Sequence, residues 1–107
     1  MEKIDFTSYQ EFTRTTAVYT NIYYPQLGLA EETGELLGKM AKAYRDGVPD
    51  LDKYEESLKK EAGDVLWMLA RLLDDQGISL EEVAKMNIDK LNNRKKNNTL
   101  HGEGDER

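Results

Sequence analysis

Two short acidic motifs constrain this chain more than any other feature of its sequence. Glu32–Thr33–Gly34–Glu35 and Glu61–Ala62–Gly63–Asp64 both read E-x-G-[ED], so each holds two carboxylates three residues apart. On a helix this spacing places both side chains on one face, with Cβ atoms roughly 5–6 Å apart. If the two helices pack side by side, four carboxylates converge and repel one another unless a cation lies among them. Mg²⁺ is the natural occupant, because it takes oxygen ligands and often bridges protein carboxylates to substrate phosphates.

The periodicity of apolar residues predicts an all-α fold, since no segment alternates long enough to predict a strand. Four helices are expected: from about Phe6 to Tyr19 with Asp5 or Thr7 as the N-cap, from Pro25 to Asp46–Gly47, from Leu51 or Lys53 to Gln76 with Gly77 as the C-cap, and from a capping box at Ser79 to about Lys96. We therefore expect one domain resembling a four-helix bundle over residues 1–96. The polar tail over residues 97–107 is expected to be disordered until something binds it.

Composition excludes several kinds of protein. A chain of 107 residues is long enough for one domain with one modest core. Fifteen basic against 21 acidic residues give a formal net charge of −6, which argues against a nucleic-acid-binding surface and a polybasic membrane patch. There is no cysteine for a disulfide or a nucleophile, and no apolar run that predicts a secretory signal or a membrane span. A cytoplasmic protein without nucleic-acid or membrane partners is the expectation.

The position of Glu61 on its helix favours a metal site over a solvated acidic face. At about 100° per residue, Glu61 falls inside the apolar arc of the third predicted helix, with Asp64 at its edge. Glu32 and Glu35 line the margin of the apolar arc of the second predicted helix, whereas Glu31 projects toward solvent. A carboxylate on a core-facing stripe must be paired or must coordinate a metal. In a chain that is 34% charged, either acidic pair alone is more typical of a solvated face, but the two together favour a site.

The fourth predicted helix supplies the opposite charge. Asn87, Lys90 and Arg94 share one face of this helix, beside its apolar stripe. Arg binds phosphate through a bidentate fork and Lys binds it as a point charge. The alternative is that Lys90 and Arg94 only stabilise the C-terminal end of their helix, where positive charge is favourable.

Three motifs together resemble one enzyme family, and the similarity covers nearly the whole chain. The motifs are Leu27-Gly28-Leu29-Ala30-Glu31-Glu32-Thr33-Gly34-Glu35-Leu36, then Glu61-Ala62-Gly63-Asp64-Val65-Leu66-Trp67, then Asn87-Ile88-Asp89-Lys90-Leu91. Their order and spacing are similar to those of the MazG-like nucleotide pyrophosphohydrolases, in the all-α NTP pyrophosphohydrolase superfamily. The tail, Leu100-His101-Gly102-Glu103-Gly104-Asp105-Glu106-Arg107, also resembles the G-x-G-D-x-R ending of short members.

The resemblance implies a site and a reaction. Glu32, Glu35, Glu61 and Asp64 match the family's Mg²⁺ ligands, with Mn²⁺ as a possible substitute, and Glu31 matches a further motif acid of variable role. Asn87, Lys90 and Arg94 match residues that hold the phosphates. The implied reaction hydrolyses a nucleoside triphosphate, with a deoxynucleoside triphosphate favoured, between the α and β phosphates to give a monophosphate and pyrophosphate. The resemblance also implies a homodimer or a homotetramer.

Two questions stay open at the level of sequence. The base of the nucleotide is not indicated: Trp67 and several tyrosines could stack on it, but aromatic side chains at helical spacing are more often packed in a core. Besides the enzyme, a non-catalytic nucleotide-binding regulatory module and a structural helical oligomerisation protein fit the pattern. The intact acidic and basic motifs favour the enzyme over the regulatory module, and the inward position of Glu61 disfavours the purely structural protein.

Overall fold

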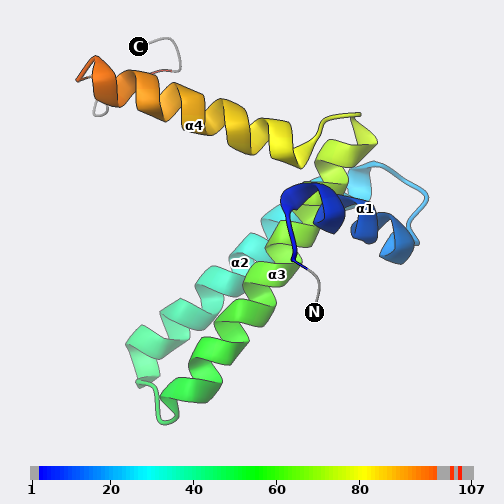
Figure 1. Cartoon of the computed structure of the whole chain (residues 1–107). Helices are drawn as coiled ribbons and strands as arrows, with labels where there is room; N and C mark the ends of the chain where they lie inside the picture. The colour runs from blue at the N-terminus through cyan, green and yellow to red at the C-terminus, as the bar shows by residue number, and fades with distance from the viewer. Residues whose placement is uncertain (1–2, 99–101, 103, 105–107) are drawn as a thin grey trace.

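A computed structural model describes residues 3–98, 102 and 104 of the chain. Within this part the fold contains four α-helices and no strands: α1 (Phe6–Thr16), α2 (Tyr23–Asp46), α3 (Leu51–Asp75) and α4 (Leu80–Lys96). Helices α2 and α3 form a long antiparallel hairpin, while α1 lies across the end of α3 and α4 extends away from the hairpin (Figure 1). The prediction of an all-α fold is confirmed.

Short polar side chains begin three of the helices, and the sequence predicts two of these caps, Asp5 and Ser79. Asp5, Asp50 and Ser79 each accept a hydrogen bond from the backbone N–H three residues later, which satisfies a donor that the first helical turn leaves unpaired. Two glycines end helices in the left-handed region, where a side chain would be strained. Gly47 follows α2 at φ 81°, and Gly77 follows the C-cap of α3 at φ 72°.

Helix α1 is shorter than predicted, since it ends at Thr16 rather than near Tyr19. Ala17 leaves the helix with an extended backbone, at φ −82° and ψ 103°. The chain then turns so that the Tyr19 hydroxyl donates a 2.6 Å hydrogen bond to Asp75 of α3. The periodicity of apolar residues does not predict a tertiary contact such as that of Tyr19. For this reason the predicted end of α1 near Tyr19 is wrong.

Close contact between α2 and α3 depends on Gly28. A Cβ atom added at Gly28 would lie 2.6 Å from the Sδ and Cε atoms of Met68, so the side chain of Met68 occupies the space that any larger residue would need. Both residues are buried, with Met68 only 5% exposed. The hairpin that carries both acidic motifs is therefore fixed by a close helix–helix approach just before the first motif.

A buried polar corner fixes α1 and the start of α4 on α3. The Gln10 side chain of α1 donates to the carbonyls of Ala70 and Ile78 and accepts a 3.0 Å hydrogen bond from the backbone N–H of Leu80. Gln10 is 5% exposed, and its three partners lie in α3, in the α3–α4 connection and at the first residue of α4. A satisfied buried amide of this kind specifies one arrangement, because any other arrangement leaves polar groups unpaired.

Arg71 forms the second part of this corner. Its guanidinium donates to Asp74, Asp75 and the Tyr19 hydroxyl at 2.7, 3.1 and 3.1 Å, although the residue is only 7% exposed. Asp74 also accepts two 2.9 Å hydrogen bonds from Arg14 of α1. The buried charge is thus paired on several sides, as a charge in a protein interior must be.

Helix α4 leaves much of its apolar surface uncovered. It contacts α1 and α3 but not α2 within the described residues, and Figure 1 shows its C-terminal half projecting away from the hairpin. Val83, Met86 and Leu91 are 38, 72 and 42% exposed. A four-helix arrangement is present, but within one chain α4 does not pack alongside α2.

Two further findings concern the sequence expectations. No helix in the described part of the chain is long and apolar enough to cross a membrane. Most of the tail motif, including Asp105 and Arg107, lies outside the described residues.

Candidate metal centre

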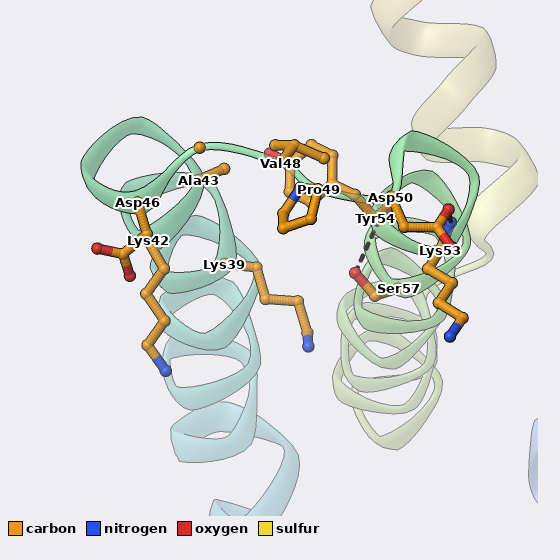
Figure 2. Close-up of a pocket in the computed structure, with 11 residues that line it drawn as sticks. Lys39, Lys42, Ala43, Asp46, Val48, Pro49, Asp50, Lys53, Tyr54 and Ser57 are labelled. Carbon is orange, nitrogen blue, oxygen red and sulfur yellow. Dashed lines mark hydrogen bonds between the residues drawn. The ribbon is translucent and has the colours of Figure 1, made fainter.

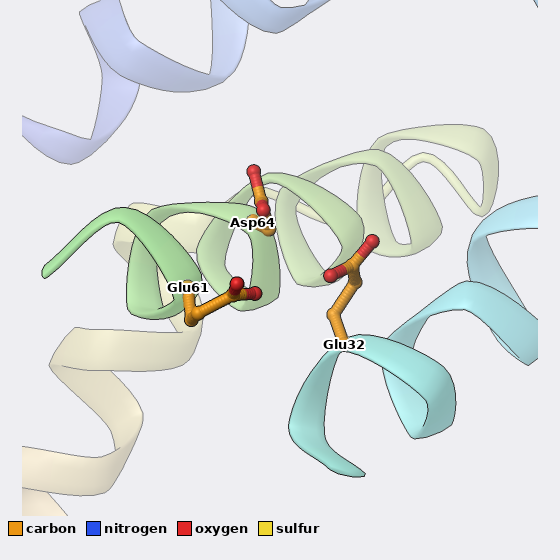
Figure 3. A group of neighbouring side chains, drawn as sticks. All are labelled: Glu32, Glu61 and Asp64. Atoms are coloured by element: carbon orange, nitrogen blue, oxygen red, sulfur yellow. The ribbon is translucent and has the colours of Figure 1, made fainter. Parts of the chain in front are cut away.

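Three of the four predicted metal ligands converge between α2 and α3. Glu32, Glu61 and Asp64 each offer a carboxylate oxygen, and these oxygens all lie within 4.8 Å of one another. Figure 3 shows Glu32 of α2 and Glu61 of α3 directed toward each other, with Asp64 beside them on α3. The convergence expected from the two acidic motifs is therefore present in a single chain, because the antiparallel hairpin places the two motifs side by side.

The chemistry of this carboxylate cluster fits a hard divalent cation. Glu32 and Glu61 are half-buried, and Oε2 of each is buried without a hydrogen-bond partner among the described residues. Asp64 is exposed and lies at the open side. Buried carboxylate oxygens without donors are unfavourable on their own, but they are suitable ligands for Mg²⁺ or Mn²⁺.

Burial, and after it the neighbouring carboxylates, make Glu32 a weaker acid than usual. Partial burial, a hydrogen-bonding contact with Glu35 and the negative charges of Glu35, Asp64 and Glu31 raise the pKa of Glu32 to about 7, in that order of importance. Since each of these effects disfavours the ionised carboxylate, a cation bound among the carboxylates would reverse the shift. The electrostatics of the apo site therefore favour the binding of positive charge.

Glu35 and Glu31 lie outside the three-carboxylate group. Glu35 is exposed and borders a cavity of about 370 Å³ that it shares with Glu61, Gly38, Lys39 and Lys42. Its role as a fourth ligand stays a prediction. Glu31 is exposed, in agreement with its expected outward direction, and acts on the cluster through its charge on Glu32.

Sequence reasoning missed Lys39 as a neighbour of the cluster. The Lys39 ammonium lies 3.9 Å from Oε1 of Glu61, across the α2–α3 contact. A signal was available, because Lys39 follows Glu35 by four residues and so shares its helix face.

The basic residues of α4 are not brought to the carboxylates within one chain. Asn87 is exposed, Lys90 is half-buried and Arg94 is buried at 5% exposure, all on a helix that does not contact α2. Arg94 donates a 3.1 Å hydrogen bond to the carbonyl of Gly104 in the tail. Their predicted role in phosphate binding is untested, and it would require another copy of the chain or a movement of α4.

The aromatic side chains near Asp64 are engaged in packing. Trp67 donates a 2.8 Å hydrogen bond through its indole N–H to Thr16, and its ring lies edge-on to Tyr19 with centroids 6.2 Å apart. Tyr19 also contacts Tyr24, at 5.5 Å between centroids. The interpretation of Trp67 as primarily a packing residue agrees with these contacts.

Helical architecture and a carboxylate cluster on an antiparallel hairpin define a class of all-α protein with a candidate divalent-cation site. Comparison with known families makes this specific, since residues 25–99 match the MazG nucleotide pyrophosphohydrolase domain. The match spans α2, α3 and α4 and leaves α1 outside. The chain belongs to the MazG nucleotide pyrophosphohydrolase family.

Two further proteins are similar to this chain. The "Gene 37 protein" of Mycobacterium phage L5 is 33% identical over 110 residues, which cover 92% of this chain and 96% of that protein. The "Uncharacterized protein YvdC" of Bacillus subtilis (strain 168) is 40% identical over 73 residues, which cover 62% of this chain and 68% of that protein. No solved structure shows significant similarity to the chain.

Proposed function

We propose that this protein is a Mg²⁺-dependent nucleoside triphosphate pyrophosphohydrolase, which cleaves between the α and β phosphates and releases a monophosphate and pyrophosphate. The observation that carries the proposal is the convergence of Glu32, Glu61 and Asp64 within 4.8 Å, on the segment that matches the MazG domain. The proposed substrate is a deoxynucleoside triphosphate, and Mn²⁺ is expected to substitute for Mg²⁺.

The residues of the site have distinct proposed roles. Glu32, Glu61 and Asp64 hold the cation, and Glu35 joins them by a change of rotamer, which an exposed side chain makes readily. When bound, Mg²⁺ supplies positive charge to phosphate oxygens and lowers the barrier to attack by water. A carboxylate of the site orients that water or accepts its proton, so the reaction proceeds without a covalent enzyme intermediate.

We further propose that the working form is a homodimer or a homotetramer. Three exposed apolar side chains on α4, Val83, Met86 and Leu91, support this, because a helix face of this kind is usually covered by a partner. In such an assembly α4 would present Asn87, Lys90 and Arg94 to the carboxylates of a second copy. Light scattering at micromolar concentration should return a multiple of the 12.3 kDa chain mass, and a monomer mass would contradict the assembly.

The reaction is tested by incubating the full chain with a panel of nucleoside triphosphates and Mg²⁺. The expected products are a monophosphate and pyrophosphate, resolved from a diphosphate and inorganic phosphate. Nucleotide binding without turnover would instead support the regulatory module, and the absence of binding would leave a structural oligomerisation protein.

A further inference from the structure

Two lysines of α2 lie next to the carboxylate cluster, and the function proposed above gives them no role. Lys39 and Lys42 follow Glu35 by four and seven residues, so the three side chains share one face of α2. With Glu61 and Gly38 they line one cavity of about 370 Å³. Acidic and basic side chains therefore border the same space, with Glu61 belonging both to this cavity and to the cluster.

The same two lysines also border a second cavity of about 370 Å³, which extends to Val48 and Pro49 in the α2–α3 turn. Figure 2 shows the Lys39 side chain directed from α2 toward α3, with Lys42 further along α2 toward the turn. Both cavities thus lie on the side of the cluster that faces the turn. A ligand in the cavity that includes Glu61 therefore borders both lysines.

Both ammonium groups can take an additional anion. The 3.9 Å between Lys39 Nζ and Glu61 Oε1 exceeds the 2.7–2.9 Å typical of a charge-assisted hydrogen bond, so Lys39 keeps donor capacity. Lys42 is exposed, and none of the ion pairs found among the described residues involves it. A lysine with spare donors beside a candidate cation site is suited to bind phosphate as a point charge.

Gly38 keeps the space between the lysines and the acids open. It lies on the wall of the shared cavity, and a Cβ atom added there would meet nothing within 4 Å. The absence of a side chain leaves room for a group the size of a phosphate next to Lys39 and Glu35.

We propose that Lys39 and Lys42 form an anion subsite that receives phosphate groups of the substrate, next to the cation held by Glu32, Glu61 and Asp64. The inference rests on the proposed function for the identity of the ligand. The Lys39 ammonium lies 3.9 Å from Oε1 of Glu61, and with a cation held by that carboxylate it would be available to a phosphate oxygen. Unlike Lys90 and Arg94 of α4, these lysines reach the carboxylates within the same chain.

The subsite is tested with inorganic pyrophosphate and Mg²⁺ as the probe, by calorimetry on the full chain. Lys39→Ala and Lys42→Ala should each weaken binding of pyrophosphate about tenfold, as expected for loss of one charge-assisted contact. Lys39→Arg should retain most of the affinity. Lys60→Ala is the matched control, because Lys60 is exposed and pairs with Glu56 on the outer face of α3.

The stabilisation produced by Mg²⁺ alone should persist in both alanine variants, which separates the subsite from the cation site. The subsite is wrong if the two variants bind pyrophosphate as tightly as Lys60→Ala does, or if the wild type does not bind it. Steady-state kinetics with a triphosphate distinguish the two proposals. Turnover with no effect of either lysine would overturn the subsite alone, whereas lysine-dependent pyrophosphate binding without turnover would overturn the reaction and leave the subsite standing.

Discussion

The α2–α3 hairpin and α4 carry opposite charges, and they differ in how the chain holds them. The hairpin is fixed by a close approach at Gly28 and brings three carboxylates together without outside help. Helix α4 is anchored at its start by the Gln10 corner and by a hydrogen bond from Thr7 to Glu81, and within the described residues it does not contact α2. The carboxylate cluster is therefore a product of packing within one chain, whereas the role proposed for α4 requires assembly.

The largest expected effect is loss of turnover when the hairpin site is altered. Glu61→Gln removes a ligand charge while keeping the shape of the side chain, so turnover should fall by about 10³-fold or more, equivalent to several kcal/mol of transition-state stabilisation. Glu55→Gln on the exposed face of α3 is the control. Steady-state kinetics measure the turnover of both variants. Near-wild-type activity of Glu61→Gln would show that the hairpin carboxylates are not part of the active site.

A second prediction concerns α4. If Lys90 binds a phosphate in the assembled protein, Lys90→Ala should raise KM or lower kcat about tenfold. The rise in melting temperature produced by Mg²⁺ should not change. Kinetics and thermal melts on the same sample separate the two effects. If Lys90→Ala has the same kinetic constants as the wild type, α4 contributes only surface charge. The hairpin would then be the only one of the two regions that takes part in the reaction.

A third prediction tests the packing of the hairpin. Gly28→Ala places a methyl group against Met68 and should reduce the free energy of unfolding by about 1–3 kcal/mol. Gly63→Ala is the matched control, since its Cβ meets nothing within 4 Å and the change should stabilise α3 by about 0.5–1 kcal/mol. Chemical denaturation measures both; equal effects would mean that the close approach at Gly28 is not needed.

The smallest expected effect concerns the corner that anchors α1. Hydrogen bonds from Arg14, supported by Arg71 and opposed by desolvation, hold the pKa of Asp74 below its ordinary value of 3.8. The ionised carboxylate therefore stabilises the fold fully above that value, and the contribution is lost as the pH falls through the lower folded pKa.

Asp74→Asn should lower the melting temperature at pH 7, and the deficit should shrink as the pH falls below about 3.8. Asp89→Asn, at an exposed position of α4, is the control. A deficit that stays constant over this range would show that the effect of Asp74 does not come from its charge.

Much of the fold could be predicted because its signals are local. The caps at Asp5 and Ser79 and the glycines at 47 and 77 each act on adjacent backbone groups, so the starts of α1 and α4 and the ends of α2 and α3 were predicted closely. The predicted end of α1 near Tyr19 was wrong: the helix ends at Thr16, and Tyr19 instead donates a hydrogen bond to Asp75, far along the chain. Long-range contacts of this kind leave no periodic signature.

The candidate site divides in the same way. Helical spacing and an antiparallel hairpin suffice to bring Glu32, Glu61 and Asp64 together, and the structure does so. The direction of α4 could not be predicted, since it is set by the buried Gln10 side chain rather than by any pattern within α4. Lys39 was missed because its partner Glu61 lies on the other helix. The sequence does, however, predict that Lys39 shares a helix face with Glu35.

The central claim is that the carboxylate cluster binds a divalent cation, and the most direct test is the thermal melt of the nucleotide-free protein with and without Mg²⁺. Binding to the folded state alone should raise the melting temperature of the wild type in a concentration-dependent way. Glu61→Gln should show little or no rise. Equal shifts in the two proteins, or no shift in the wild type at millimolar Mg²⁺, would contradict the account.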